Sequence, residues 1–243
     1  MRFENQHVVV TGGTRGIGRA ITEAFLAEGA TVHATYRSGD EAAEALRAEV
    51  GEAAERLVLA RVDLGDPEAV TGFWTGLEDT PISTLVNNAG IRRDGILATM
   101  SEEDWGAVLD TNLTGGYRMA KEAVKNMLPQ RYGRIVFVTS PAGRVGFEGQ
   151  GNYAASKAGQ VGLARALCKE VAKRKITVNC VSPGFIETEL LSDLPDDLAK
   201  SYKSSVPMRR FGKPAEVASA VLYLASPEAA YVTGSLLEVT GGL

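Results

Sequence analysis

The chain has 243 residues and a net charge of −4, with 44% hydrophobic and 23% charged residues. This is the composition of an ordinary globular protein, and its acidic balance excludes a general attraction to nucleic acid or anionic membranes. No apolar run reaches the roughly eighteen residues of a membrane helix, and no signal-peptide pattern precedes the first strand-like run, so we predict a cytoplasmic protein. Cys168 and Cys180 are the only cysteines and are interpreted as core residues; with two histidines, no metal site is expected.

Short apolar runs rich in β-branched residues alternate with helical patterns along the chain. The predicted strands are residues 7–12, 31–37, 56–63, 83–90, 133–140, 176–184 and 235–242. The predicted helices include residues 17–30, 41–50, 101–128 and 153–174. Strands that are apolar throughout and alternate with helices indicate a parallel sheet buried on both faces.

Right-handed crossovers between such strands give an α/β, Rossmann-type, doubly wound sheet of about seven strands with helices on both faces. The sequence contains no linker, repeat or low-complexity segment. Residues 1–243 are therefore predicted to form a single domain.

A glycine-rich turn lies between the first predicted strand and the first predicted helix. Gly12, Gly16 and Gly18 are spaced as GxxxGxG rather than as the commoner GxGxxG. Glycines here allow a sharp turn and a close backbone approach to a pyrophosphate at the helix N-terminus. The alternative interpretation of these glycines is a tight strand-to-helix connection that binds no ligand. The other residues of this turn that we assign to the cofactor site are Thr14, Arg15 and Ile17.

The end of the second predicted strand bears on the choice between NAD and NADP. An acid there would bind the adenosine 2′-hydroxyl, but the sequence has Arg37, and no acid follows until Asp40. Arg15 and Arg37 together suit a 2′-phosphate, because each guanidinium can form charge-assisted bonds in a fork. NADPH is therefore favoured, although Arg37 could also be a solvated loop charge.

Five motifs occur in a family's order over nearly the whole chain: TGGTRGIG at 11–18, NNAG at 87–90, TNL at 111–113, YAASK at 153–157 and PGFIET at 183–188. The chain resembles the short-chain dehydrogenase/reductase family. Within that family it is most similar to 3-oxoacyl-[acyl carrier protein] reductases, on runs such as NNAGIRRDGILATM and ITVNCVSPGFIET.

Tyr153 and Lys157 are four residues apart and share one face of a predicted helix. We expect the ammonium to lower the pKa of the phenol. Ser140 ends a predicted strand at the edge where open parallel sheets bind ligands, so its hydroxyl can reach a substrate carbonyl. The resemblance implies that Tyr153 donates the proton during carbonyl reduction, that Lys157 holds the nicotinamide ribose, and that Asn112 anchors a water in a relay to Lys157. Without the resemblance, Tyr153 and Lys157 would be interpreted as an exposed pair on a helix. Ser140 would be interpreted as the end of a strand, and Asn112 as the cap of a turn.

The resemblance also implies further contacts with the cofactor. The third predicted strand would be followed by adenine contacts, the fourth by ribose contacts and the sixth by nicotinamide contacts. The residues are Asp63 and Leu64, then Asn88, Ala89 and Gly90, then Pro183, Gly184, Ile186 and Thr188. A cap of a helix or turn is the alternative for Asp63.

The segment after Ser140 departs from the family pattern. Pro141 stiffens this loop and removes a backbone donor. Phe147 and Glu148 lie beside the expected substrate entrance, so the acyl group accepted could differ from ordinary fatty-acid intermediates. A polyketide or polyene chain on a carrier protein is therefore kept open.

The predicted activity is NADPH-dependent reduction of a 3-oxoacyl thioester carried by acyl carrier protein. Arg131 and Arg174 match basic positions that the resemblance assigns to carrier docking, with solvated surface arginines as the alternative. The helices near 101–128 and 153–174 are expected to form a dimer face, and a homotetramer follows from the resemblance. Two other readings remain open: reduction of another carbonyl, such as a CoA thioester or small ketone, and a catalytically silent subunit paired with a homologue.

Overall fold

The structure is a computed structural model that describes residues 1–189 and 195–243. Its core is a sheet of seven parallel strands in the order β3-β2-β1-β4-β5-β6-β7. The predicted doubly wound α/β sheet is therefore confirmed. The strands are β1 (His7–Thr11), β2 (Thr31–Tyr36), β3 (Leu57–Arg61), β4 (Ile82–Asn87), β5 (Gly133–Val138), β6 (Ile176–Pro183) and β7 (Leu236–Val239).

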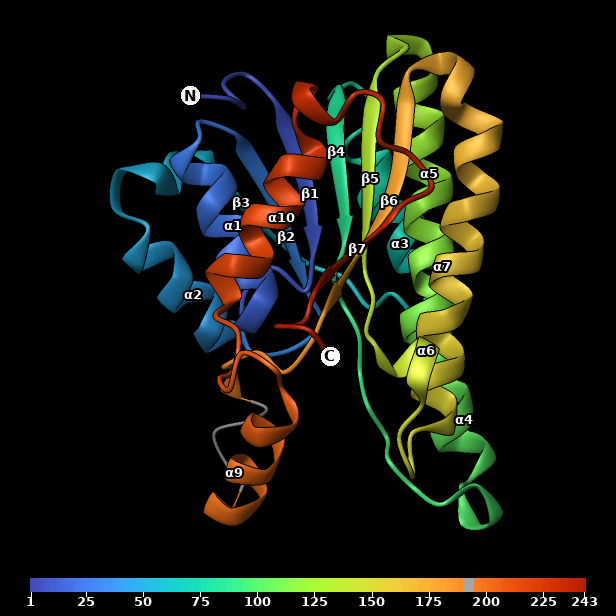
Figure 1. Cartoon of the computed structure of the whole chain (residues 1–243). Coiled ribbons are helices and arrows are strands. Elements are labelled where there is room, and N and C mark those ends of the chain that lie inside the picture. The colour runs from blue at the N-terminus through green and yellow to red at the C-terminus, as the bar shows by residue number, and fades with distance from the viewer. Residues whose placement is uncertain (190–194) are drawn as a thin grey trace.

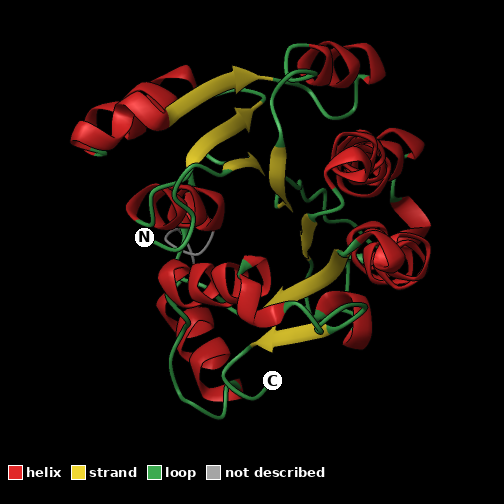
Figure 2. Ribbon diagram, turned by 90° about the horizontal axis from the view of Figure 1, so that it is seen from above, coloured by secondary structure: helices red, strands yellow, loops and turns green. Residues whose placement is uncertain are grey.

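The helices are α1 (Gly16–Ala27), α2 (Asp40–Glu49), α3 (Pro67–Thr75), α4 (Glu102–Leu109), α5 (Gly115–Gln130), α6 (Ala142–Val145), α7 (Gly151–Val171), α9 (Asp196–Ser205) and α10 (Pro214–Ala225). Helices α1, α2 and α10 cover one face of the sheet, and α3, α5 and α7 cover the other (Figures 1 and 2). Each face has its own apolar cluster, and β4, β5 and β6 are buried throughout. Burial on both faces explains why these strands are apolar without alternation.

The predicted helix over 101–128 is interrupted in the structure. Helix α4 passes into a π-helical turn at Asp110–Thr114 before α5 begins. Helical spacing of apolar residues does not distinguish this turn from an α-helix, because it adds only one residue to one turn. Helices α3, α6, α9 and α10 were not predicted from the sequence.

The order of the strands creates a switch point between β1 and β4. The chain proceeds outward from β1 to β3 and then returns to place β4 on the other side of β1. In such sheets ligands bind beyond the carboxyl ends of the strands at this point. The glycine turn after β1 and the NNAG segment after β4 both lie there.

Within residues 1–189 and 195–243, no helix combines the length and the hydropathy needed to cross a membrane. Among the same residues, no group of three or more histidine, cysteine and acidic side chains is placed to hold a metal ion. Cys168 and Cys180 are buried, unpaired thiols, as predicted.

Candidate active site

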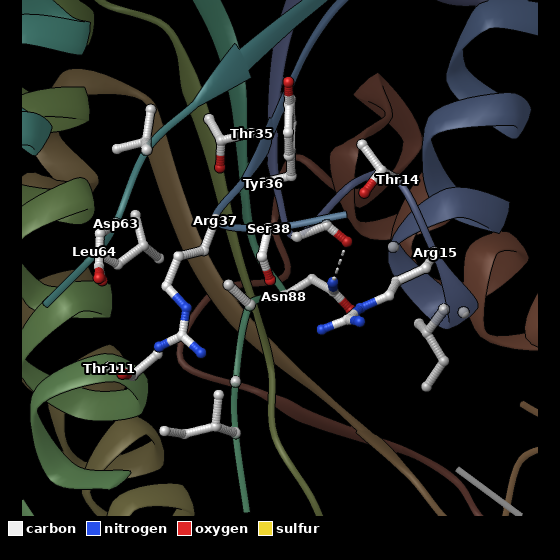
Figure 3. A pocket seen from close by; sticks show the side chains of 18 of the residues that line it. Thr14, Arg15, Thr35, Tyr36, Arg37, Ser38, Asp63, Leu64, Asn88 and Thr111 are labelled. Atoms are coloured by element: carbon white, nitrogen blue, oxygen red, sulfur yellow. Dashed lines mark hydrogen bonds between the residues drawn. The ribbon is translucent and has the colours of Figure 1, made fainter. Parts of the chain in front are cut away.

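A cavity of about 590 Å³ opens at the switch point (Figure 3). Residues that the sequence assigned to the cofactor form most of its wall: Gly12, Thr14, Arg15, Gly16, Ile17, Gly18, Arg37, Asp63, Leu64, Asn88, Ala89, Gly90 and Thr188. The other seven residues of the wall were not predicted from the sequence: Thr35, Tyr36, Ser38, Val62, Ile91, Thr111 and Glu189. Most of these seven residues are next to a predicted site residue in the sequence. Their position beside the end of a predicted strand could therefore have identified them.

Two glycines of the turn, Gly12 and Gly18, are held in positions that disfavour a side chain. Gly12 has φ +62°, and a Cβ on Gly18 would lie 2.0 Å from the carbonyl oxygen of Gly12. Asn88 fastens this turn to β4, since its Nδ2 donates to the carbonyl oxygens of Thr11 at 2.9 Å and Gly12 at 3.2 Å. The Thr11 hydroxyl in turn accepts the backbone N–H groups of Asn88 and Ala89, both at 3.0 Å. The two motifs thus form one braced backbone surface.

Helix α1 points its N-terminus at this surface. It begins at Gly16, and the side chain of the preceding residue, Arg15, makes no capping hydrogen bond. The first N–H groups of a helix have no partner within the helix, so they and the helix dipole favour an anion. The turn therefore suits a pyrophosphate.

Two guanidinium groups enter the cavity from opposite sides of Ser38. Arg15 comes from the glycine turn and Arg37 from the end of β2 (Figure 3). The nearby acid Asp40 does not line the cavity; it accepts a hydrogen bond from the Tyr36 side chain and lies 4.0 Å from Arg61. This end of the cavity is therefore cationic.

The opposite wall offers apolar surface beside a polar turn. Val62 and Leu64 are each 5% exposed and line the cavity. The Asp63 carboxylate accepts the N–H of Gly65 at 2.9 Å, so it caps a turn as well as facing the cavity. A glycine cradle, two cations and an apolar slot together fit the adenosine and diphosphate portions of a dinucleotide.

Ser140 and Tyr153 meet at the same edge of the sheet. Ser140 follows β5, Tyr153 lies in the first turn of α7, and their side chains are hydrogen-bonded. The Ser140 hydroxyl also accepts the N–H of Ala142 at 3.2 Å, which fixes its position. A serine and a phenol held together at this edge can act on one carbonyl oxygen.

Lys157 lies one turn further along α7 and is 3% exposed. Its Nζ donates to the carbonyl oxygen of Val138 at 2.8 Å and lies 5.6 Å from the centroid of the Tyr153 ring. Burial lowers the pKa of Lys157 to about 8 and raises the pKa of the neighbouring Cys180 thiol to about 12. At neutral pH the lysine is still mainly an ammonium.

The sequence predicted a lowered pKa for Tyr153, and this direction is wrong for the protein without a bound cofactor. Burial raises the pKa of the phenol, and this effect outweighs the hydrogen bond from Ser140 and the positive charge of Arg92, which lower it. Sequence spacing showed the ammonium but not the desolvation, which disfavours the charged phenolate.

Asn112 occupies the centre of the π-helical turn and is 1% exposed. Its amide accepts the N–H of Ile91 at 2.8 Å and donates to the Ile91 carbonyl at 3.0 Å and to the Ser156 hydroxyl at 3.1 Å. A Cβ built on Gly90 would lie 3.3 Å from Asn112 Oδ1 and 3.5 Å from Lys157 Nζ. The asparagine and the lysine therefore meet at Gly90.

Several predicted site residues do not line the cavity: the catalytic candidates Asn112, Ser140, Tyr153 and Lys157, of which Tyr153 and Lys157 were also predicted cofactor contacts, and three predicted nicotinamide contacts. Pro183 ends β6, and a Cβ on Gly184 would lie 2.9 Å from Thr240 Cα. Ile186 is 5% exposed and forms an isolated β-bridge with Gly212. These three nicotinamide candidates pack the backbone at the end of β6 into the core.

A family model described as Enoyl-(Acyl carrier protein) reductase matches residues 12–243 of this chain. The chain belongs to the short-chain dehydrogenase/reductase family. As a member, it is an enzyme of the kind that uses a nicotinamide dinucleotide, which accords with the cavity.

The curated relatives of this short-chain dehydrogenase/reductase match it over its length. It is 45% identical to the 3-oxoacyl-[acyl-carrier-protein] reductase FabG of Vibrio harveyi and 42% identical to that of Escherichia coli, covering 100% of this chain and 99% of each relative. It is also 44% identical to Nodulation protein G of a Rhizobium species, over 97% of this chain and 95% of that protein. The enzyme is therefore 3-oxoacyl-carrier-protein-reductase-like.

The structure separates the predicted docking residues of this reductase from its predicted catalytic residues. Arg131 precedes β5 and Ser140 follows it, so they lie at opposite ends of a strand about 20 Å long. Arg174 follows α7, whereas Tyr153 lies near its start, about 30 Å away along the helix. Arg131 and Arg174 therefore share the edge of the sheet opposite the cavity.

Proposed function

We propose that this reductase uses NADPH to reduce 3-oxoacyl thioesters, presented by acyl carrier protein, to 3-hydroxyacyl thioesters in fatty-acid or polyketide/polyene chain synthesis. The observation that carries the proposal is the bonded Ser140–Tyr153 pair beside buried Lys157, whose Nζ lies 3.5 Å from a Cβ built on Gly90 of the cavity wall. The identity of 42–45% with 3-oxoacyl reductases over the whole chain supports the substrate class.

Each residue of this group has a separate part in the proposed reaction. NADPH, when bound, supplies hydride to the carbonyl carbon. Ser140 donates a hydrogen bond to the carbonyl oxygen, and Tyr153 transfers its proton to that oxygen as it becomes an alkoxide. The ammonium of Lys157 stabilises the phenolate that remains and, with a pKa lowered to about 8, can pass on a proton near neutral pH. Asn112 holds the Ile91 backbone beside them.

A cluster of three aromatic rings, from Phe147, Phe185 and Tyr202, is relevant to which acyl chains the enzyme accepts. Phe147 is 45% exposed, and its ring centroid is 6.4 Å from that of Phe185. Phe185 stacks on Tyr202 of α9 with centroids 4.7 Å apart. These rings offer planar apolar surface next to the end of β6, which supports keeping polyketide and polyene chains among the substrates.

The proposal is tested by following NADPH oxidation with a 3-oxoacyl carrier protein, the matching CoA thioester, an enoyl thioester and a small ketone. We expect the 3-oxoacyl carrier protein to give the highest kcat/KM. A preference for the small ketone would support the alternative carbonyl, and an absence of turnover with all four substrates would support a silent subunit.

We infer NADPH rather than NADH from Arg15 and Arg37. Replacing Arg37 by alanine should weaken NADPH binding about tenfold or more, since one charge-assisted hydrogen bond to the 2′-phosphate is lost. NADH binding should change little. Fluorescence titration of both cofactors measures this, with Arg47→Ala on the exposed side of α2 as the control. Equal losses for NADPH and NADH would remove the basis of the assignment.

We also propose that the face formed by α5 and α7 joins two copies of the chain. Along α7 the exposed residues include Ala158, Gly162 and Ala166, which permit close helix packing, and Tyr117 of α5 is 47% exposed. If two copies pair in opposite directions here, the Arg131 and Arg174 edge of one copy approaches the active edge of the other. In such a dimer, a carrier protein docked on Arg131 and Arg174 of one copy could deliver its substrate to the active site of the other copy.

Light scattering at micromolar concentration should therefore give a dimer or tetramer. The substitution Gly162→Arg should shift the protein toward monomer, because an arginine cannot fit between closely packed helices. Gly72→Arg on α3 is the control, since both glycines are exposed with no atom within 4 Å of a built Cβ. A wild-type monomer would contradict the proposed face.

A further inference from the structure

We propose that Arg92 is a positioning residue of this reductase, which together with Asp94 sets the pH range over which Tyr153 holds its proton. Arg92 lies in the segment between β4 and α4, outside the four residues assigned above. The inference rests on the proposed role of Tyr153, but its test does not require turnover.

The Arg92 guanidinium and the Lys157 ammonium lie at similar distances from the phenol. Arg92 Cζ is 5.9 Å from the centroid of the Tyr153 ring, and Lys157 Nζ is 5.6 Å from it. Tyr153 thus has a cation from its own helix and a second from a neighbouring segment. At such a distance near a protein surface, an unpaired charge changes a titration midpoint by roughly two pH units.

The backbone around Arg92 is fastened to the start of α7, so the segments that carry Arg92 and Tyr153 are held side by side. Three hydrogen bonds make the connection: Gly95 N to Gly149 O at 2.8 Å, Gln150 Nε2 to Asp94 Oδ2 at 3.2 Å, and Asn152 Nδ2 to Arg93 O at 2.9 Å. They span the residues immediately before Tyr153 in the sequence. The Arg92 side chain is 35% exposed, so water screens it only in part.

Asp94 opposes Arg92 at the same site. The Arg92 Nε donates to Asp94 Oδ1 at 3.2 Å, and its Nη2 contacts Asp94 Oδ2. The positive charge of Arg92 lowers the pKa of Tyr153, whereas the negative charge of Asp94 raises it. The other groups that face the phenol or this ion pair are Ser140 after β5, Lys157 on α7 and Tyr202 on α9.

Substitutions of the two charges should therefore act in opposite directions. Arg92→Gln leaves Asp94 alone near the phenol and should move the Tyr153 titration upward by about one pH unit. Asp94→Asn leaves Arg92 unpaired and should move it downward by a similar amount. A purely structural disturbance would not move the Tyr153 titration in opposite directions when Arg92 and Asp94 are replaced.

The experiment is a nuclear magnetic resonance titration of protein labelled with ¹³Cζ-tyrosine, in which Tyr153→Phe assigns the resonance. Wild type, Arg92→Gln, Asp94→Asn and Arg92→Lys are compared, with Arg93→Gln as the control because Arg93 pairs with Asp104 at 3.5 Å and is 57% exposed. We expect opposite shifts for the first two variants and wild-type behaviour for Arg92→Lys and Arg93→Gln. An unchanged midpoint in Arg92→Gln, or shifts of the same sign in Arg92→Gln and Asp94→Asn, would overturn the inference.

The pH profile of NADPH oxidation separates this inference from the proposed function. If Tyr153 donates the proton, the alkaline limb of the profile should move with the resonance in each variant. Shifts of the resonance without a shift of the limb would count against the role of Tyr153 and leave the effect of Arg92 established.

Discussion

Replacing Tyr153 by phenylalanine should lower the rate of 3-oxoacyl thioester reduction by about 10²–10⁴-fold, the usual contribution of a positioned general acid. The change removes one oxygen and keeps the ring beside which Lys157 and Arg92 lie. NADPH affinity should stay within a few-fold of wild type, because the glycine turn and both cavity arginines are untouched. The loss should therefore appear in kcat, measured by NADPH oxidation, while fluorescence titration shows retained binding.

Two controls separate this result from a folding defect. The variant loses its hydrogen bond with Ser140, worth about 1 kcal/mol, so its Tm should fall only slightly. Tyr231→Phe, at an exposed tyrosine to which we assign no role, should leave both turnover and Tm unchanged. A Tyr153→Phe variant with wild-type turnover would end the role we assign to this residue.

Gly18→Ala should have the largest effect on cofactor binding. The added Cβ would lie 2.0 Å from the carbonyl oxygen of Gly12 and 2.5 Å from Asn88 Nδ2, so the glycine turn must move away from α1. Overpacking of this kind usually costs about 1–3 kcal/mol, and here it falls on the backbone that would receive the pyrophosphate. We expect NADPH affinity to fall at least tenfold and the Tm to decrease.

The matched control is Gly72→Ala, another helical glycine. No atom lies within 4 Å of a Cβ built at Gly72 in α3, so alanine there should leave NADPH binding unchanged and should raise stability by about 0.5–1 kcal/mol. Fluorescence titration and thermal unfolding of both variants measure the contrast. Wild-type affinity and Tm in Gly18→Ala would show that the turn is not the rigid surface described here.

The sheet could be predicted because each strand is a short apolar run that ends near glycine or a polar residue. β5 and β6 are the clearest cases, since both are buried at every position. The π-helical turn at Asp110–Thr114 could not be predicted, because one extra residue leaves the pattern of apolar positions nearly unchanged.

The site was predictable where a motif fixes the backbone and less so where separate segments meet. Gly18 is required because a Cβ would overlap the carbonyl oxygen of Gly12, and Gly12 because its φ of +62° favours glycine, so their spacing carried the information. Arg92 was missed because it reaches Tyr153 from a segment 61 residues earlier in the sequence. The sign of the Tyr153 pKa shift was missed because burial of the phenol depends on the packed structure.

The central claim, reduction of the 3-carbonyl group of an acyl thioester, is tested most directly by the position of the transferred hydrogen. Reduction of a 3-oxoacyl carrier protein with NADPH deuterated at nicotinamide carbon 4 should yield a 3-hydroxyacyl product with one deuterium at carbon 3, as shown by mass spectrometry. A recovered 3-oxoacyl substrate, or a label at any other carbon, would contradict the account.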